Sequence, residues 1–381
     1  MEFARTEQQN RLIGMVQAYC ERHCSPEQAA QLDLQPQFPR SAYTAMAKAK
    51  ILGHWLPVEY GGGGGDFTDA LTICESLARH TGTFANLFIV NSVCGALVAR
   101  NGSPQQRRQL LPDIASGQLS MAFAMTEPKA GSDGSAIEFS AIADAGNYVL
   151  NGTKLFTTGA QDAEYILVVA RTIYGVSASH GTALLIVPRP IAGLEVTAMD
   201  KVAGQCQASC QLTFRDVRIP IANLLASEQQ TWGALGYGMS MERLGIAGTM
   251  LGIAAGALEE FTQFAAQRCQ FGQPIGSFQS IQHQVAELAT QLEAMRWLAY
   301  RAAWMADNRI ECRKEISMAK SFCVDTGMQI ATQTMRLVGG DGYLRTSSFN
   351  RRWREAALGF YAGGTREIQL NNIARFMNLP N

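Results

Sequence analysis

The sequence AMTEPKAGSD occupies positions 124–133 of this chain of 381 residues. It combines turn-forming residues with two hydroxyls (Thr126 and Ser132) and two carboxylates (Glu127 and Asp133). An apolar, strand-like run precedes it, and a segment rich in Ser and Gly follows it. Alone, such a stretch is typical of an elaborate surface turn. Its meaning depends on three other segments, namely FTTG at 156–159, RCQFG at 268–272 and GGTRE at 363–367.

The overall composition limits what the protein can bind. With 32 basic and 32 acidic side chains the formal net charge is zero, which argues against a nucleic-acid backbone as the main partner. No uncharged apolar run reaches the roughly 20 residues that cross a bilayer, and the charged N-terminus lacks the apolar core of a secretory signal. The nine cysteines and five histidines are scattered, without the spacing of a metal site. We therefore expect a soluble, cytoplasmic protein with reduced thiols and with no metal, nucleic-acid or membrane partner.

The spacing of apolar residues changes twice along the chain and indicates helices, then strands, then helices. Up to about residue 118, apolar side chains recur at helical spacing, as at Leu87, Val90, Val93 and Leu97. The next hundred residues alternate short apolar runs with turns, which is typical of strands. Long amphipathic patterns then return and end at Gly339-Gly340, which predicts an antiparallel helical bundle.

Within the strand-rich segment, Asn151-Gly152 predicts a β-hairpin between the runs 148–150 and 154–156. Several short strands separated by turns favour a β-barrel or a compact sandwich. We therefore expect an α+β protein with three domains: an N-terminal helical domain (1–118), a β-barrel domain (119–226) and a C-terminal four-helix bundle (227–381).

The four segments occur in the order and at the spacing of the acyl-CoA dehydrogenase family of flavoproteins, which the chain resembles over nearly its whole length. The family's first signature is a small residue, an apolar residue, Ser/Thr, Glu, two free positions, a small residue, Gly, Ser/Thr and Asp. Residues 124–133 fit it at each position. The resemblance implies the family's three-part fold and bound FAD. The residues that it implies for cofactor binding are Met125, Thr126, Gly131, Ser132, Phe156, Thr158, Arg268, Phe271, Phe278, Gln279, Arg336, Gly339, Gly340, Thr365 and Glu367.

The resemblance implies different roles for these segments. Thr126 would hydrogen-bond the pyrimidine edge of the flavin, and Phe156 would stack near the isoalloxazine, although Phe156 alone also fits a core position. Arg268 would reach the FAD pyrophosphate of a neighbouring subunit, because a planar guanidinium donates hydrogen bonds in pairs. Arg268 followed by Gly272 also fits the end of a helix, and both interpretations can hold. Arg336 stands where the family usually has Gln, so the cofactor contact at that position stays open.

Most members of the family carry a glutamate immediately before the Gly-Thr of the C-terminal motif, and it removes the α-proton of the substrate. Here that position is Gly363, which has no side chain to take a proton. In isovaleryl- and long-chain-type members the base lies on a bundle helix, and the sequence MERLG at 241–245 puts Glu242 at the matching position. A glutamate on a helix is usually solvated, but glycine at the usual position favours Glu242 as the base. The residues expected to bind substrate are Ser132, Ser240 and Arg243.

The implied reaction is the α,β-dehydrogenation of an acyl thioester, from acyl-CoA to trans-2-enoyl-CoA. Glu242 would take the α-proton and flavin N5 the β-hydride, while the backbone N–H of Gly363 would donate to the thioester carbonyl. The implied partners are an electron-transfer flavoprotein and further copies of this chain, usually in a homotetramer and at least in a homodimer.

Departures from the family pattern at Ala226 and 228–231 leave coenzyme A and a carrier protein both open as the acyl carrier. The alternatives are a biosynthetic dehydrogenase of a carrier-bound acyl unit, an enzyme re-oxidised by oxygen, an enoyl-thioester reductase, and a flavin-binding protein without turnover.

Overall fold

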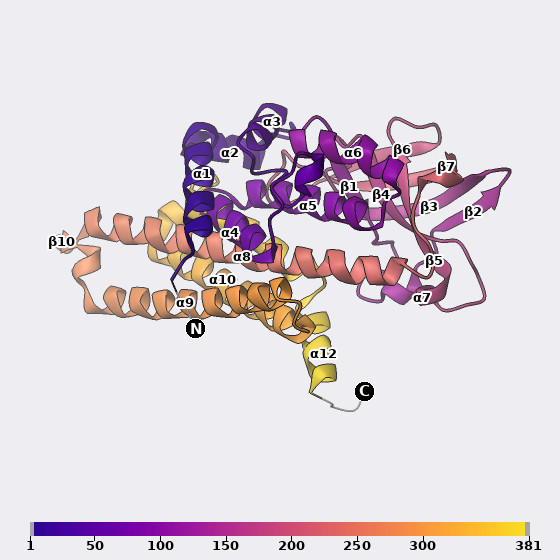
Figure 1. Cartoon of the computed structure of the whole chain (residues 1–381). Helices are drawn as coiled ribbons and strands as arrows, with labels where there is room; N and C mark the ends of the chain where they lie inside the picture. Colours follow the sequence, from indigo (N-terminus) through magenta and orange to yellow (C-terminus); the bar gives the residue numbers. More distant parts are fainter. Residues whose placement is uncertain (1–3, 378–381) are drawn as a thin grey trace.

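Two helical parts and one sheet make up the fold, and the computed structural model describes residues 4–377 (Figure 1). The order of elements is helical, then strand-rich, then helical again, which confirms the predicted three-part fold. The predicted first and third domains also include residues 1–3 and 378–381, which lie outside the described residues. The domain boundaries after Gln118 and Ala226 stay a proposal; they fall between α6 and β1 and between β8 and α8.

Six α-helices form the described portion of the first part, from residue 4 to residue 118. Three of them begin with a capping box, in which the side chain of Thr6, Ser25 or Ser103 accepts a hydrogen bond from a backbone N–H three residues later. The apolar periodicity at Leu87–Leu97 lies in the fifth helix, as predicted. The six helices are α1 (Glu7–His23), α2 (Pro26–Leu34), α3 (Arg40–Lys48), α4 (Phe67–Ala78), α5 (Gly82–Asn101) and α6 (Pro104–Ser116).

The middle part is one mixed sheet of eight strands, and not the closed barrel that was predicted. Its strand order, β6-β7-β3-β2-β4-β5-β8, has two free ends, and β1 pairs in parallel with β4 beside this path. Short strands and turns in a sequence do not reveal whether the last strand pairs with the first, so the barrel prediction failed there. The strands are β1 (Met121–Ala124), β2 (Ser140–Asp144), β3 (Asn147–Thr158), β4 (Tyr165–Arg171), β5 (Thr182–Pro188), β6 (Leu194–Met199), β7 (Ser209–Pro220) and β8 (Leu224–Ala226), with the short α7 (Ala178–Gly181) before β5.

The hairpin predicted at Asn151-Gly152 is wrong. Both residues lie inside the single strand β3, where the pairing with β7 shifts register and Gly152 has a φ of 132°. The β2–β3 hairpin instead turns at Ala145 and Gly146, whose φ values are 46° and 81°. Two positive φ values in succession are the mark of a type I′ turn. Here glycine at 152 makes a bulge and not a turn.

The third part contains long helices that are antiparallel neighbours (Figure 1). The helix α10 packs against α8, α9, α11 and α12, while α8 also packs against α4 and α5 of the first part. One continuous core therefore joins the two helical parts. The elements are α8 (Thr231–Gln267), β9 (Cys269–Gln270), β10 (Gln273–Pro274), α9 (Gln279–Asp307), α10 (Arg313–Leu337), α11 (Ser348–Ala356) and α12 (Arg366–Phe376).

Two helices, α5 and α8, are long and apolar enough to cross a membrane by composition. In each, however, 83% of the apolar window is buried inside the protein. A helix that is apolar all round is expected where other helices cover it on every side. The apolar surface of α5 and α8 therefore forms the core shared by the two helical parts.

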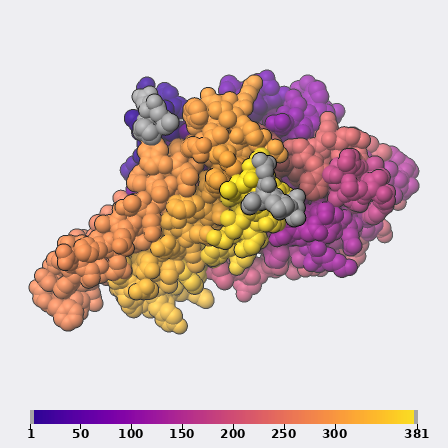
Figure 2. Space-filling view, turned by 90° about the horizontal axis from the view of Figure 1, so that it is seen from below, coloured from indigo at the N-terminus to yellow at the C-terminus, as the bar shows by residue number. Residues whose placement is uncertain are grey.

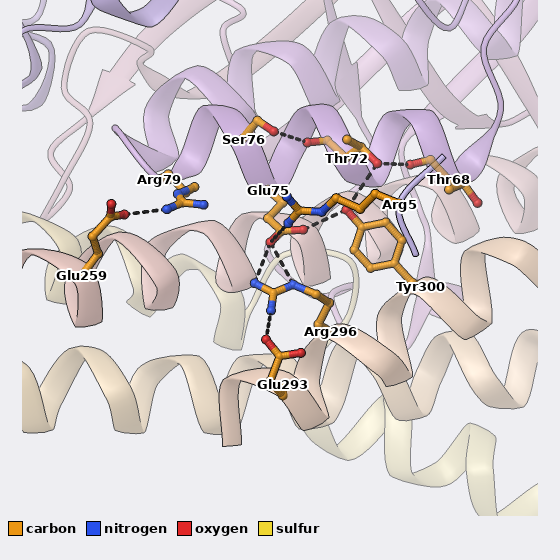
Figure 3. Close-up of polar contacts among 10 residues, drawn as sticks. All are labelled: Arg5, Thr68, Thr72, Glu75, Ser76, Arg79, Glu259, Glu293, Arg296 and Tyr300. Carbon is orange, nitrogen blue, oxygen red and sulfur yellow. Dashed lines mark hydrogen bonds and ion pairs between the residues drawn. The ribbon is translucent and has the colours of Figure 1, made fainter. Parts of the chain in front are cut away.

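A polar cluster around Glu75 on α4 connects the first part to the bundle (Figure 3). The buried Glu75 carboxylate accepts hydrogen bonds from Arg296 at 3.0 Å and from the Tyr300 hydroxyl at 2.8 Å, both on α9. A second pair, Arg79 with Glu259, joins α4 to α8 at 2.5 Å. Because these partners satisfy the carboxylate, we assign the cluster to the packing of α4 against the bundle.

Candidate active site

Glu242 lies on α8, inside a stretch of the helix that is otherwise apolar. Between Thr231 and Leu258 the only charged residues in the sequence are Glu242 and Arg243. The Glu242 side chain is half-buried, and its Oε1 accepts a hydrogen bond from the backbone N–H of Gly363 at 3.1 Å. The two residues named as catalytic from the sequence are therefore in direct contact, although 121 positions separate them.

Burial is the main influence on the pKa of Glu242, and it raises that pKa above the ordinary value of 4.5. Arg243, the hydrogen bond from Gly363 and the charge of Lys320 act in the opposite direction. A carboxylate whose pKa is raised is a stronger base than a solvated one. The environment of Glu242 therefore suits a proton acceptor.

Glycine at position 363 suits the observed turn. Gly363 and Gly364 have φ values of 66° and 88°, in the region that glycine adopts most easily. A Cβ built on Gly363 would lie 3.0 Å from Cδ1 of Ile246 and 3.3 Å from Cγ of Arg243. The guanidinium Nε of Arg243 also donates to the Gly363 carbonyl oxygen at 2.9 Å. The turn thus lies directly against α8, in contact with Arg243, with Ile246 and with the Glu242 carboxylate.

Two further side chains hold this turn, and the sequence reasoning missed both. Nζ of Lys320 on α10 donates to the carbonyl oxygens of Gly359 and Gly364 at 2.9 and 2.7 Å. Nε2 of Gln369 on α12 donates to the carbonyl oxygens of Gly363 and Gly364, each at 3.1 Å. Both side chains are buried. Lys320 follows Ile316 by four residues and precedes Cys323 by three, so the periodicity used for the helix already placed it on the buried face.

The loop at 125–133 begins on a buried ion pair. Lys154 on β3 has no exposed surface, and its Nζ donates to Oε1 of Glu127 at 2.7 Å and to the Met125 carbonyl oxygen at 2.9 Å. The other oxygen of Glu127 accepts the backbone N–H of Glu138 at 2.8 Å. Burial lowers the pKa of Lys154 to about 8. The pair fixes the start of the loop, while Gly131 and Ser132 at its tip are exposed.

The residues predicted to lie beside the isoalloxazine are next to this pair. The backbone N–H of Leu155 donates to the Thr126 carbonyl oxygen at 2.8 Å. Thr126, in the loop after β1, and Phe156, in β3, therefore lie on neighbouring segments of the chain. Phe156 is 60% exposed and has a φ of 56°. An exposed aromatic ring is unfavourable unless something covers it, and a left-handed backbone at a bulky residue is strained, which is common at functional sites. This arrangement fits a flat aromatic ring system; Thr158, half-buried, lies two residues further on.

A second group of predicted cofactor residues lies at the opposite end of the bundle. β9 and β10 form a small hairpin there, at the end of an arm made by α8 and α9 (Figures 1 and 2). At its tip Phe271 is 94% exposed, and the Phe271 and Phe278 rings lie 6.2 Å apart. Val338 packs in the same small core as Phe261 and Ala265. This core keeps the end of α10 near the arm and groups Arg268, Phe271, Phe278, Gln279, Arg336, Gly339 and Gly340.

The structure therefore does not bring the two groups together within one chain. Arg268 caps α8 and follows Glu242 by 26 residues, which is about 39 Å along a helix. Arg336 is exposed and donates to Gln333 on its own helix. Arg268 and Gly272 do not form one joint helix end, because Phe271 and Gly272 make the turn of the β9–β10 hairpin with φ values of 53° and 80°.

The remaining predicted residues are less distinctive. Thr365 caps α12 by accepting the backbone N–H of Ile368 at 3.4 Å, and Glu367 is exposed in the first turn. The Ser240 hydroxyl donates to the Gly236 carbonyl oxygen of its own helix at 2.9 Å. A serine that bonds to its own helix backbone has only its acceptor capacity left for a ligand. The predicted substrate role of Ser240 therefore has less support from the geometry than that of Arg243.

Comparison with known proteins covers the whole fold. Three family models match, namely "Acyl-CoA dehydrogenase, N-terminal domain" over residues 6–118, "middle domain" over 122–217 and "C-terminal domain" over 231–378. The chain is 30% identical to mitochondrial isovaleryl-CoA dehydrogenase of Pongo abelii, over 98% of this chain and 89% of that protein.

Two further relatives extend the comparison to a complex and to a solved structure. The subunit CarC of the caffeyl-CoA reductase–Etf complex of Acetobacterium woodii is 30% identical, over 95% of this chain and 96% of that subunit. The solved structure of butyryl-CoA dehydrogenase from Megasphaera elsdenii superimposes with a TM-score of 0.95 at 27% identity, covering 100% of both chains.

Proposed function

Because this chain belongs to the acyl-CoA dehydrogenase family, we propose that it is an FAD-dependent oxidoreductase that converts an acyl-CoA into the trans-2-enoyl-CoA. The contact between the Glu242 carboxylate and the Gly363 N–H carries this proposal. It supplies a carboxylate beside the turn at which most of the family has its glutamate. The chain thus keeps the chemical group while its position in the sequence has moved.

The residues of the chain account for the proton transfer. Glu242 removes the α-proton of the thioester, and burial makes its carboxylate a better proton acceptor. The N–H of Gly363 is bonded to Glu242 in the free protein, and we propose that it turns to the thioester carbonyl oxygen when substrate binds. This exchange stabilises the developing enolate oxygen and removes a hydrogen bond that lowers the pKa of the base. FAD, when bound, accepts the β-hydrogen as a hydride.

We propose two sets of residues for the FAD site, which follow the two groups in the fold. The set at the sheet is Met125, Thr126, Gly131, Ser132, Phe156 and Thr158, with Thr365 and Glu367 at the start of α12 near the base. The set at the end of the arm is Arg268, Phe271, Phe278, Gln279, Arg336, Gly339 and Gly340. Because about 39 Å of helix separates Glu242 from Arg268, the arm of a second copy would have to complete each site. The exposed Phe271 supports an arm that inserts into a partner.

We extend the proposal to partners and location. The acyl carrier is coenzyme A, and a carrier protein remains the second candidate, with Ser132 and Arg243 contacting the substrate. An electron-transfer flavoprotein takes up the electrons, and the assembly is a homotetramer or at least a homodimer. All nine cysteines are unpaired and eight of them are buried, which fits a reducing cytoplasm.

The test compares two glutamine variants on the same helix. Glu242→Gln is expected to purify with bound flavin, and acyl-CoAs added without oxygen should not bleach it. Glu259→Gln, at an exposed position of α8, should bleach like the unchanged protein. The measurement is the flavin absorbance after mixing with a panel of acyl-CoAs. Full bleaching of Glu242→Gln would show that another group is the base, and no bleaching of the unchanged protein would refute the dehydrogenase proposal.

The reverse reaction is a second candidate, which the likeness to the caffeyl-CoA reductase subunit favours. In that direction a protonated Glu242 would deliver a proton to the α-carbon of an enoyl thioester. Chemically reduced flavoprotein mixed with enoyl-CoAs measures this direction, and the two rates together decide which one dominates.

A further inference from the structure

Lys320 is a buried lysine that has no carboxylate within 4.0 Å among residues 4–377. Its side chain has no exposed surface, and its ammonium contacts two carbonyl oxygens of the loop 359–364. In the described part of the chain, the lysines that form ion pairs within 4.0 Å are Lys129, Lys154 and Lys314. Burial of an unpaired charge is unfavourable, and an apolar side chain could fill the same space. The charge therefore calls for a role beyond packing.

The loop that Lys320 contacts is the one that ends at the Gly363 N–H. Its backbone leaves the 3₁₀ helix Ala357–Phe360 and turns at Gly363 and Gly364 before α12. Lys320 binds it at both ends, through the carbonyls of Gly359 and Gly364, which lie five residues apart. Glycine in the turn gives the backbone many alternative conformations. In the observed conformation, two hydrogen bonds from the buried ammonium hold the loop while the Gly363 N–H reaches Glu242.

Few charges face Glu242. Arg243 is its neighbour on α8, Lys320 lies on α10, and the Gly363 N–H comes from the loop. Across from it on α5, Cys94 is buried, and burial raises the pKa of this thiol, so that the thiol is neutral. Lys320 is in turn influenced by Arg243 and Glu242 and by two acids, Asp325 on α10 and Glu367 on α12. Lys320 is thus the one cation that a second helix brings to the carboxylate among residues 4–377.

We propose that Lys320 is a positioning residue for the base: its ammonium fixes the loop that presents the Gly363 N–H, and its positive charge beside that loop favours the ionised form of the Glu242 carboxylate. This rests on the proposed function, because it takes Glu242 to be the base. Gln369 shares the first task, since it binds the same two glycine carbonyls, but it has no charge for the second.

The experiment separates the two proposed roles of Lys320. The first, the anchor, is its hydrogen bonding to the loop, and the second is the effect of its charge on Glu242. The limiting rate of flavin reduction is measured without oxygen across a pH series, with the acyl-CoA that reduces the unchanged protein fastest. Lys320→Met should keep its flavin and lose about 10- to 100-fold in rate, as expected when a reacting group is misplaced. The acid limb of its pH–rate profile, where the rate falls as the base is protonated, should also move to higher pH. Loss of a nearby cation raises the pKa of the carboxylate.

Three companion variants sharpen the result. Lys320→Arg keeps the charge, so its acid limb should stay in place while the rate recovers in part. Gln369→Leu removes an anchor and leaves the charge, so its rate should fall with the acid limb unmoved. Lys314→Met, at a more exposed lysine of the same helix, should match the unchanged protein in both readings.

Several outcomes would overturn the proposal. Lys320→Met with an unchanged rate would refute the anchor, and an unmoved acid limb would refute the role of the charge. If Lys320→Met fails to fold, Lys320→Arg and Gln369→Leu still decide the question by their pH profiles. Amide hydrogen exchange of segment 359–365, which should be faster in Lys320→Met than in Lys314→Met, tests the anchor without turnover. No reduction of the unchanged protein by any acyl-CoA would instead refute the proposed function.

Discussion

Lys154 in the sheet and Lys320 in the bundle are both fully buried, and burial lowers the pKa of each to about 8. They differ in what surrounds the ammonium. Lys154 donates to the Glu127 carboxylate at 2.7 Å, whereas Lys320 donates to two backbone carbonyls. The first charge is neutralised where it lies, and the second is left to act on a carboxylate further away. The comparison shows that the partner of a buried lysine, and not the extent of its burial, tells what the lysine does.

The two lysines also hold different kinds of structure. Lys154 and Glu127 join β3 to the start of the loop 125–133, and Glu127 also receives the N–H groups of Glu138 and Phe139. In this network the ammonium and the carboxylate neutralise each other, and both oxygens of the carboxylate accept hydrogen bonds. Lys320 holds a glycine turn whose N–H points at Glu242. We therefore expect changes at Lys154 to act on stability and changes at Lys320 to act on the reaction.

The largest expected effect on stability is that of Lys154→Met. It would leave the buried Glu127 carboxylate without its cation, which typically costs about 3–5 kcal/mol of unfolding free energy. Urea unfolding followed by circular dichroism measures this loss, and flavin release should accompany it, because the loop 125–133 starts at this pair. A second substitution, Glu127→Gln, removes the stranded charge and should restore part of the stability. A double variant as unstable as Lys154→Met would show that the ion pair is not the cause.

Lys320→Met should cost less stability than Lys154→Met. It leaves only neutral carbonyls without their donor, and an unsatisfied buried acceptor typically costs about 1–3 kcal/mol. Gln369 still binds the carbonyls of Gly363 and Gly364, which favours the lower part of that range. The same urea unfolding measurement applies. A loss equal to that of Lys154→Met would mean that Lys320 has a counter-ion in effect, and the contrast between the two lysines would disappear.

The sequence predicted the order of helical and strand-rich parts well because that order depends on periodicity, while the family resemblance implied the three-part fold. Helical spacing at Leu87–Leu97 and the stop at Gly339-Gly340 both correspond to real elements, α5 and the end of α10. Where a single local signal had to decide a long-range pairing, it failed. Asn151-Gly152 has the composition of a hairpin turn, but β7 pairs alongside both halves of β3 and keeps the strand continuous. Closure of the sheet failed as a prediction for the same reason.

Residues of the candidate site could be named from the sequence where a motif contains them, and could not be named where only packing brings them to the site. Glu242 and Gly363 could be named from the sequence, and the structure places them in contact. Lys320 and Gln369 belong to no motif, and their role depends on how α10 and α12 meet the loop. Apolar periodicity alone could have marked Lys320 as a buried charge. It could not have said which carbonyls the ammonium would reach.

The smallest expected effect on stability is that of Glu242→Gln. It tests how far Arg243 and Lys320 offset the cost of burying the Glu242 carboxylate. Burial raises the pKa of Glu242 despite Arg243 and Lys320, so the folded protein binds a proton more readily there than the unfolded chain. Such a group stabilises the fold below its unfolded pKa and loses that contribution as pH rises through its folded pKa. Glu242→Gln should therefore be more stable than the unchanged protein at pH 7, by about 0.5–2 kcal/mol. The gain should vanish as pH falls toward the ordinary glutamate pKa of 4.5.

Thermal unfolding of the flavin-loaded proteins at several pH values measures this gain, with Glu287→Gln at an exposed position of α9 as the control. A gain at pH 7 would mean that Lys320 offsets only part of the cost of burying the base, as expected for a cation that does not pair with it. A less stable Glu242→Gln at pH 7 would mean the opposite. Lys320 and Glu242 would then behave as an ion pair like Lys154 and Glu127, and the carboxylate would be held by its partner at the expense of its basicity.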